Sequence, residues 1–183
     1  MVILRPTRKL SSVLPATGTA RSSSDTALGD WYVNRIVVAG QPILLLVSSG
    51  SLLPILVPAR DVRSLPIRLA EILEDRLRRL DIDARIIYEE KNAMTPVEIA
   101  PTQDRSVLGI MVDFARLVSY HLDSRHSNES ALRLVEDKLA ETPCHAGKSF
   151  DRVIFPKKKA PELLRLRWLA NTPLQPSAVE RGG

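Results

Sequence analysis

The apolar residues change their spacing about one third of the way along the chain, and this change constrains the fold most. Before residue 58 they form short runs rich in β-branched and aromatic side chains, which favour strands. From residue 63 they mostly recur every three or four residues, as in helices packed by one face. We therefore expect an α+β, mixed α/β fold: a small, mostly antiparallel sheet from the N-terminal half, packed against three or four helices.

The strand-like runs are Val2–Pro6, Trp31–Val38, Ile43–Val47, Leu52–Val57 and Ala84–Tyr88. The second and third flank Gly40-Gln41-Pro42, which supplies turn residues, so they predict a hairpin. The first run is short and edge-like. The fourth contains Pro54, which cannot donate a ladder hydrogen bond, so it is either an edge strand or a short helical turn.

Helical spacing occurs in Arg63–Leu80, Asp104–Leu122, Ser130–Ala140 and Pro161–Leu169. The first is the clearest, because Leu69, Leu73, Leu77 and Leu80 form one apolar face. In the second, the expected buried stripe is Leu108, Met111, Ala115, Val118 and Leu122.

With 183 residues, the chain fits one core, and we expect a single domain over residues 1–170. Residues 11–27 are rich in Ser, Thr, Ala, Gly and Pro without either period, which predicts a flexible loop. Residues 171–183 are expected to be a disordered tail.

The formal charge of +5 lies entirely beyond residue 147, since the upstream residues balance. The candidate basic patch there consists of Lys157, Lys158, Lys159, Arg165 and Arg167. Such a cluster could neutralise phosphates and bind nucleic acid weakly. Against this, short lysine runs before a helix are usually solvated loops, and no aromatic residues are interleaved for stacking on bases.

Cys144 is the only cysteine, so the fold does not depend on disulfides, and we expect a cytoplasmic protein. No apolar stretch is long enough to cross a bilayer, and we expect no membrane association. The residues able to bind a soft metal are His121, His126, Cys144 and His145, but their spacing is poor. We therefore expect no metal site and no cofactor.

The strongest candidate binding site is the polar stripe of the second predicted helix: Arg105, Gly109, Asp113, Arg116, Tyr120 and Asp123. Its guanidinium groups could grip an anion or carboxylate, and Gly109 could admit a partner backbone. The alternative is structural: the two arginines pair with Asp113, and Gly109 makes room for a neighbouring element. Trp31 could likewise be a ligand platform, although an aromatic residue that opens a strand more often belongs to the core.

Four segments, at 2–10, 28–34, 104–113 and 139–143, resemble a bacterial family of domains of unknown function, numbered 6933. The most specific is Arg-Ser-Val-Leu-Gly-Ile-Met-Val-Asp at 105–113. Members of the family have a serine where this chain has Ile110 and an asparagine where it has Val112. The resemblance covers roughly residues 2–170 and implies a fold, but no activity, substrate or cofactor.

No nucleophile elbow, Walker loop or dinucleotide-binding turn is present, so no enzyme class is indicated. The leading hypothesis is a non-enzymatic binding or regulatory module whose partner, a protein or an anionic molecule, contacts the polar stripe, the basic C-terminal end or both. The rival is an enzyme that acts on an anionic small molecule through Arg105, Asp113 and Arg116. A closed pocket over these residues would favour the enzyme, and a flat face the binding module.

Overall fold

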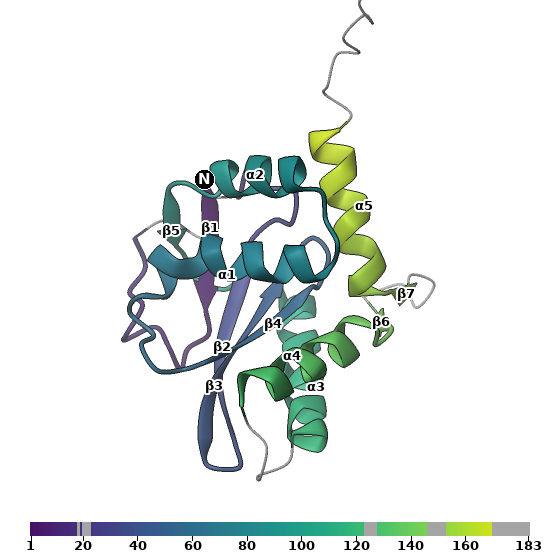
Figure 1. Cartoon of the computed structure of the whole chain (residues 1–183). Helices are drawn as coiled ribbons and strands as arrows, with labels where there is room; N and C mark the ends of the chain where they lie inside the picture. The colour runs from purple at the N-terminus through teal and green to yellow at the C-terminus, as the bar shows by residue number, and fades with distance from the viewer. Residues whose placement is uncertain (18, 20–22, 123–127, 146–152, 170–183) are drawn as a thin grey trace, which may run out of the picture.

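A computed structural model describes residues 1–17, 19, 23–122, 128–145 and 153–169. Its centre is a five-stranded sheet in the order β4-β3-β2-β1-β5 (Figure 1). The strands are β1 (Val2–Pro6), β2 (Trp31–Val38), β3 (Gln41–Ser48), β4 (Pro54–Pro58) and β5 (Val97–Ile99). With helices on both sides, this is the α+β fold that the sequence predicted.

The sheet is mixed rather than uniform. β3 runs antiparallel to β2 and β4, while β1 is parallel to both β2 and β5. The prediction of an edge-like β1 was therefore wrong: β1 lies between two strands and all five of its residues are buried. Because both of its faces are covered, β1 reads as an unbroken apolar run around Arg5 instead of an alternating one.

The predicted hairpin is confirmed as β2–β3, with Val38 opposite Gln41. Ala39 and Gly40 form its two-residue turn, and both have positive φ, as the right-handed twist of a hairpin requires. The ambiguous run after it is the edge strand β4. Pro54 is tolerated there because the outer side of an edge strand needs no donor.

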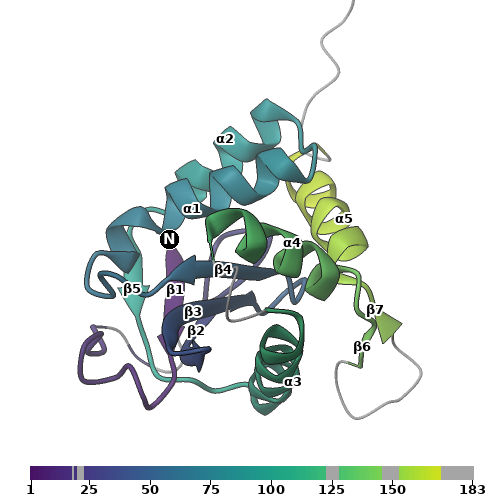
Figure 2. The same ribbon diagram turned by 60° about the horizontal axis from the view of Figure 1, so that its bottom comes forward.

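The sheet separates two apolar cores. On one face, Trp31, Val33 and Leu46 pack with the leucines of α1 (Leu65–Arg79). On the other face, Tyr32 and Leu45 pack with α3 (Arg105–His121). The alternation along β2 and β3 thus sends successive side chains to opposite cores, and Figure 2 shows α1 and α3 on opposite sides of the sheet.

The expected strand at Ala84–Tyr88 is instead the first half of a helix, α2 (Ala84–Ala93). The Asp83 side chain caps it by accepting from the Arg85 amide at 2.8 Å. Ile86, Ile87 and Glu90 are its buried residues and lie on one helical face. The apolar run was too short to reveal this period, so the prediction of a strand was wrong.

The helices α1 and α3 match their predicted ranges closely, and α4 (Glu129–Ala140) matches the third prediction. The buried residues of α3 are Val107, Ile110, Met111, Phe114 and Val118, while Leu108 and Ala115 are only half-buried. The buried stripe is therefore rotated relative to the predicted one, because both stripes contain enough apolar residues to satisfy a helical period.

The last helix, α5 (Pro156–Trp168), begins five residues earlier than predicted. Pro156 occupies the first turn, where its missing N–H is harmless, and Pro161 lies inside the helix. Only one face docks, through Pro156, Ala160 and Leu164, whereas Leu166 is 61% exposed. A short pair of strands, β6 (Cys144–His145) and β7 (Val153–Ile154), lies between α4 and α5 in sequence.

Residues 11–27 contain no helix or strand among those described. Several of them nevertheless contact the body of the domain. Leu14 is buried in the core on the α1 side, the Thr17 amide donates to the Ile99 carbonyl at 2.8 Å, and the Asp25 amide donates to the Met1 carbonyl at 2.9 Å. The flexibility predicted for this loop remains a prediction, and the predicted tail at 171–183 lies outside the described residues.

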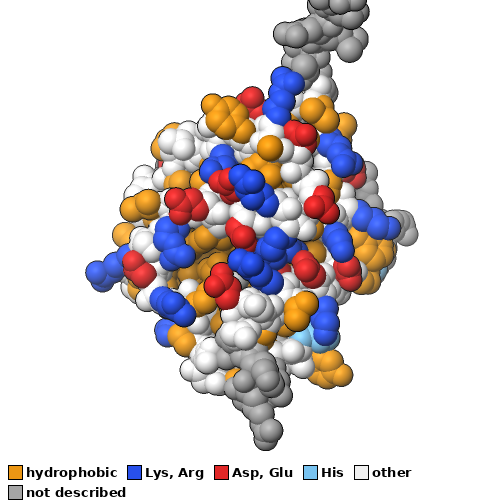
Figure 3. Space-filling view, viewed as in Figure 1, with side chains coloured by type: hydrophobic (Ala, Val, Ile, Leu, Met, Phe, Trp, Pro, Cys, Tyr) orange, Lys and Arg blue, Asp and Glu red, His pale blue; other side chains and the backbone are white. Residues whose placement is uncertain are grey.

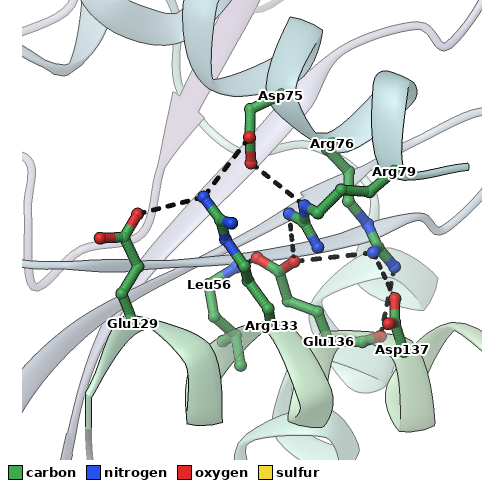
Figure 4. A network of polar contacts seen from close by, with 8 residues as sticks. All are labelled: Leu56, Asp75, Arg76, Arg79, Glu129, Arg133, Glu136 and Asp137. Carbon is green, nitrogen blue, oxygen red and sulfur yellow. Dashed lines mark hydrogen bonds and ion pairs between the residues drawn. The ribbon is translucent and has the colours of Figure 1, made fainter.

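A buried ion-pair network joins α1, α4 and β4 (Figure 4). Glu136 on α4 accepts from the Leu56 amide at 2.6 Å and from Arg79 at 2.7 Å, and it lies 3.7 Å from Arg76. Arg76, which is fully buried, also pairs with Asp137 at 2.5 Å. The network fixes α4 against the edge of the sheet, because each buried charge needs its partners in place.

Candidate functional site

The polar stripe predicted from the sequence lies on the exposed side of α3. Arg105, Gly109, Asp113, Arg116 and Tyr120 are all exposed, and Tyr120 retains 83% of its accessible surface. Asp123, the last member of the predicted stripe, lies outside the described residues. In Figure 2 the outer side of α3 faces away from the sheet, and no other described element lies beyond it. We call these five residues, together with Val112, the α3 face.

Val112 adds an apolar component to the α3 face. It is 51% exposed and lies one turn after Gly109 and one turn before Arg116. The face therefore combines an apolar side chain, an aromatic ring and three charges around a glycine. Exposed aromatic and arginine side chains of this kind are enriched where proteins contact one another.

Gly109 is not explained by packing within the described part of the chain. A Cβ built on it meets no atom within 4 Å, and the residue lies in the interior of a regular helix. Gly50 is a contrast, because a Cβ there would lie 2.9 Å from the Leu28 carbonyl oxygen. Glycine in a helix interior costs about 1 kcal/mol relative to alanine. The structural alternative, that Gly109 makes room for a neighbouring element, finds no such element among the described residues.

The charges of the α3 face are only loosely paired. Arg116 lies 3.5 Å from Asp113 on the same helix, and both side chains are largely exposed, so the pair contributes little. Arg105, the first residue of the helix, has no ion pair with any other described residue. The structural alternative expected both arginines to pair with Asp113. Arg116 does so, whereas Arg105 does not pair with Asp113.

In the described part of the chain, the cavity beside the α3 face does not enclose its charged residues. A cavity of about 130 Å³ lies beside it, between α3 and the segment before β6, and of the three charged residues only Asp113 lines it. Cys144 and His145 line the same cavity. Burial, and secondarily the charge of Asp113, raises the pKa of the Cys144 thiol to about 11, so the thiol stays protonated and is a poor nucleophile.

Trp31 is fully buried in the core on the α1 side, where its ring packs among aliphatic side chains. Its indole Nε1 is buried and has no hydrogen-bond partner within the described residues. A ligand platform needs an accessible ring face. Trp31, the first residue of β2, is therefore a core residue and not a part of the α3 face.

The basic patch lies on α5 rather than on a loop, since all three lysines belong to the first turns of that helix. Two of them are already paired: Lys157 with Glu141 and Lys159 with Glu162, each at 2.7 Å. Lys158 lies over the Phe155 ring, 5.4 Å from its centre. The cations are therefore partly neutralised within the chain. The face seen in Figure 3 likewise has acidic and basic side chains interspersed, without a field of one sign.

Among the buried carboxylates that the sequence analysis missed, two lie on helices. Glu90 on α2 accepts from the amides of Ala27 and Leu28 and from the Trp168 indole, at 2.8–3.1 Å, and so links the loop before β2 to α5. Burial raises the pKa of Glu90 despite these donors. The other is Glu136, in the network described above. Both are structural, because their oxygens are occupied by protein donors.

The burial of Glu136 could have been predicted from the sequence. Glu136 lies four residues after Leu132 and three before Leu139, on the apolar stripe of α4, and Arg76 lies three residues after Leu73 on the stripe of α1. Charged residues in register with an apolar stripe indicate a buried pair.

The described residues contain no group of three His, Cys, Asp or Glu side chains arranged to hold a metal ion. His126, one of the potential ligands, lies outside them. None of the helices in the described ranges is both long enough and apolar enough to span a membrane.

Comparison with known proteins shows which family the chain belongs to. No curated protein matches the chain. The model of the domain of unknown function DUF6933 matches residues 3–159, a range that runs from β1 into the first turn of α5 and includes the whole of α3. This match confirms the resemblance found in the sequence, and the chain belongs to the DUF6933 family.

Proposed function

We propose that this protein is a non-enzymatic binding module and that its partner docks on the α3 face. The observation that carries the proposal is Gly109, a helix-interior glycine with open space in front of it. Such a residue lowers the stability of the free protein, and a close approach by a partner backbone offsets that cost. Val112 and Tyr120 supply apolar area around the glycine, and Arg105 and Arg116 supply charges that fix orientation.

The form of the surface favours a protein partner over a small-molecule substrate. Sites for small molecules are usually enclosed volumes of about 300–1,000 Å³. The cavity beside Asp113 is smaller, at about 130 Å³, and Arg105 and Arg116 do not line it. An exposed helix with polar and apolar residues around a glycine suits contact with another helix or an extended segment.

The test compares three tagged full-length chains, captured from cells that also express an untagged copy. Gly109→Leu fills the open space, while Ser130→Leu adds the same side chain at an exposed position on α4. We expect proteins that co-purify with the wild type and with Ser130→Leu, quantified by mass spectrometry, to be depleted at least about tenfold with Gly109→Leu.

Both variants should unfold at or above the wild-type temperature, because leucine is a better helix former than glycine or serine, and no described atom lies within 4 Å of a Cβ at position 109. Equal recovery of every co-purifying protein with all three chains would overturn the proposal, as would the absence of any protein above a mock capture.

A further inference from the structure

We infer that the partner of the α3 face is a second copy of this chain, which packs its own α3 antiparallel to the first across a two-fold axis at Gly109. This inference rests on the proposed function, since it names the occupant of the same face. It depends on how the charges are placed about the glycine, on the free space in front of it and on the absence of an ion pair between Arg105 and any other described residue.

The charges of the α3 face are arranged symmetrically about Gly109. Arg105 lies four residues before it and Asp113 four residues after it, so all three share one row of the helix. Four residues rise about 6 Å along the axis. In an antiparallel pair that crosses at Gly109, Arg105 of each copy therefore lies opposite Asp113 of the other, and two ion pairs form at once.

The same charges select the direction of the pair. In a parallel pair, Arg105 would face Arg105 of the other copy and Asp113 would face Asp113, which is unfavourable at both ends. Asp113 is available for the intermolecular pair, because its contact with Arg116 is 3.5 Å long and largely solvent-exposed.

The position of Arg105 is electrostatically unfavourable in a single copy of the chain. Arg105 occupies the first position of α3, where the helix dipole disfavours a cation, and the neighbouring Asp104 carboxylate is used to cap the helix by accepting from the Ser106 and Val107 amides. No described residue pairs with its guanidinium group. A carboxylate from a second copy would supply the missing partner at this helix end.

Gly109 allows the two helices to approach. Helix axes usually pack 8–10 Å apart, depending on the side chains at the contact, and a glycine at the crossing point brings them to the low end of that range or below. No described atom lies within 4 Å of the place that a Cβ would take at Gly109. Val112, half-exposed one turn away, would then be covered by the second copy.

The test measures the association state of the purified full-length chain and its variants by sedimentation velocity over a range of concentrations. One helix pair with its flanks makes a small interface, so we expect a reversible dimer of about micromolar affinity. Arg105→Asp and Asp113→Arg each place like charges opposite each other, and each should weaken dimerisation at least about tenfold.

An equimolar mixture of the two single variants is the decisive sample. In a mixed dimer, Asp at position 105 of one chain faces Arg at position 113 of the other, and Asp113 of the first faces Arg105 of the second. Both pairs are again opposite in charge, so the mixture should dimerise to within about threefold of the wild type. Only antiparallel pairing about Gly109 predicts this recovery.

The matched controls are Arg68→Asp and Glu71→Arg, which change the same charges on the exposed side of α1. Each should dimerise like the wild type. A wild-type chain that stays monomeric, single variants that dimerise normally, or a mixture that stays monomeric would each overturn the inference. The proposed function fails separately, when Gly109→Leu leaves every captured protein unchanged. If Gly109→Leu depletes other captured proteins but leaves the amount of the untagged copy unchanged, only the inference is overturned and the proposed function stands.

Discussion

The buried network between α1 and α4 leads to a sharp prediction about stability. Glu136 is 1% exposed, and its two oxygens serve Leu56, Arg79 and Arg76. In Glu136→Leu, the Leu56 amide loses its acceptor, which costs about 1–3 kcal/mol. Arg76, fully buried, keeps only Asp137 as a carboxylate partner. Breaking a buried pair in this way typically costs about 3–5 kcal/mol in total, which is the loss we expect.

The second half of the prediction separates the charge from the packing. In the double variant Arg76→Met and Glu136→Leu, the fully buried guanidinium is removed together with its partner. Arg79 keeps its pair with Asp75, and Asp137 is half-exposed and can be solvated. The two substitutions should therefore be less destabilising together than their sum, with a coupling of about 0.5–3 kcal/mol. Glu129→Ala is the control, because that exposed pair with Arg133 should contribute less than about 1 kcal/mol.

The assay is urea unfolding at neutral pH, followed by tryptophan fluorescence, with the free energy extrapolated to water for each variant. A loss below about 1 kcal/mol for Glu136→Leu would refute the argument that the network is a fixed part of the core. Strictly additive losses in the double variant would refute the coupling between the two buried charges.

Four other features lead to predictions: the core around α1, the buried carboxylate of α2, the segments 11–27 and 172–183, and the basic patch. Leu73, fully buried against the sheet, should lose about 2–5 kcal/mol on replacement by alanine, and thermal unfolding within a degree of the wild type would contradict this. Burial raises the pKa of Glu90, so its contribution to stability is full below the ordinary glutamate pKa and is lost as pH rises through the folded-state pKa. The advantage of the wild type over Glu90→Gln in urea unfolding should therefore shrink as the pH is raised above the ordinary glutamate pKa, and a constant difference would show that Glu90 does not titrate differently on folding. Limited proteolysis should cut first within 11–27 and 172–183, and cleavage elsewhere before either would be inconsistent with this. Since two of the three lysines at 157–159 are already paired, the chain should not bind a short duplex or single strand saturably in fluorescence anisotropy at low salt, and binding that is abolished by alanine at all three would disprove this.

Most of the helices and strands could be predicted from the amino-acid sequence. The leucine spacing predicted α1, the alternation around Gly40 predicted the hairpin, and the polar residues of α3 were correctly placed on an exposed stripe. These inferences succeed because the period of the apolar residues reports directly which side of an element is buried. The family resemblance carried by residues 105–113 was visible there as well.

The pairings between distant segments could not be predicted without the folded structure. The interior place of β1 depends on parallel pairing with β5, which follows it by more than ninety residues, and no local pattern encodes such a partner. The helix α2 could not be predicted either, because its apolar run is too short to show a helical period. The partners of Glu136 are arginines from another helix, so its ion pairs also depend on the tertiary structure. The open space before Gly109 was equally out of reach of the sequence. A spacing gives the direction in which a residue points, whereas what it meets there depends on where the rest of the chain has folded.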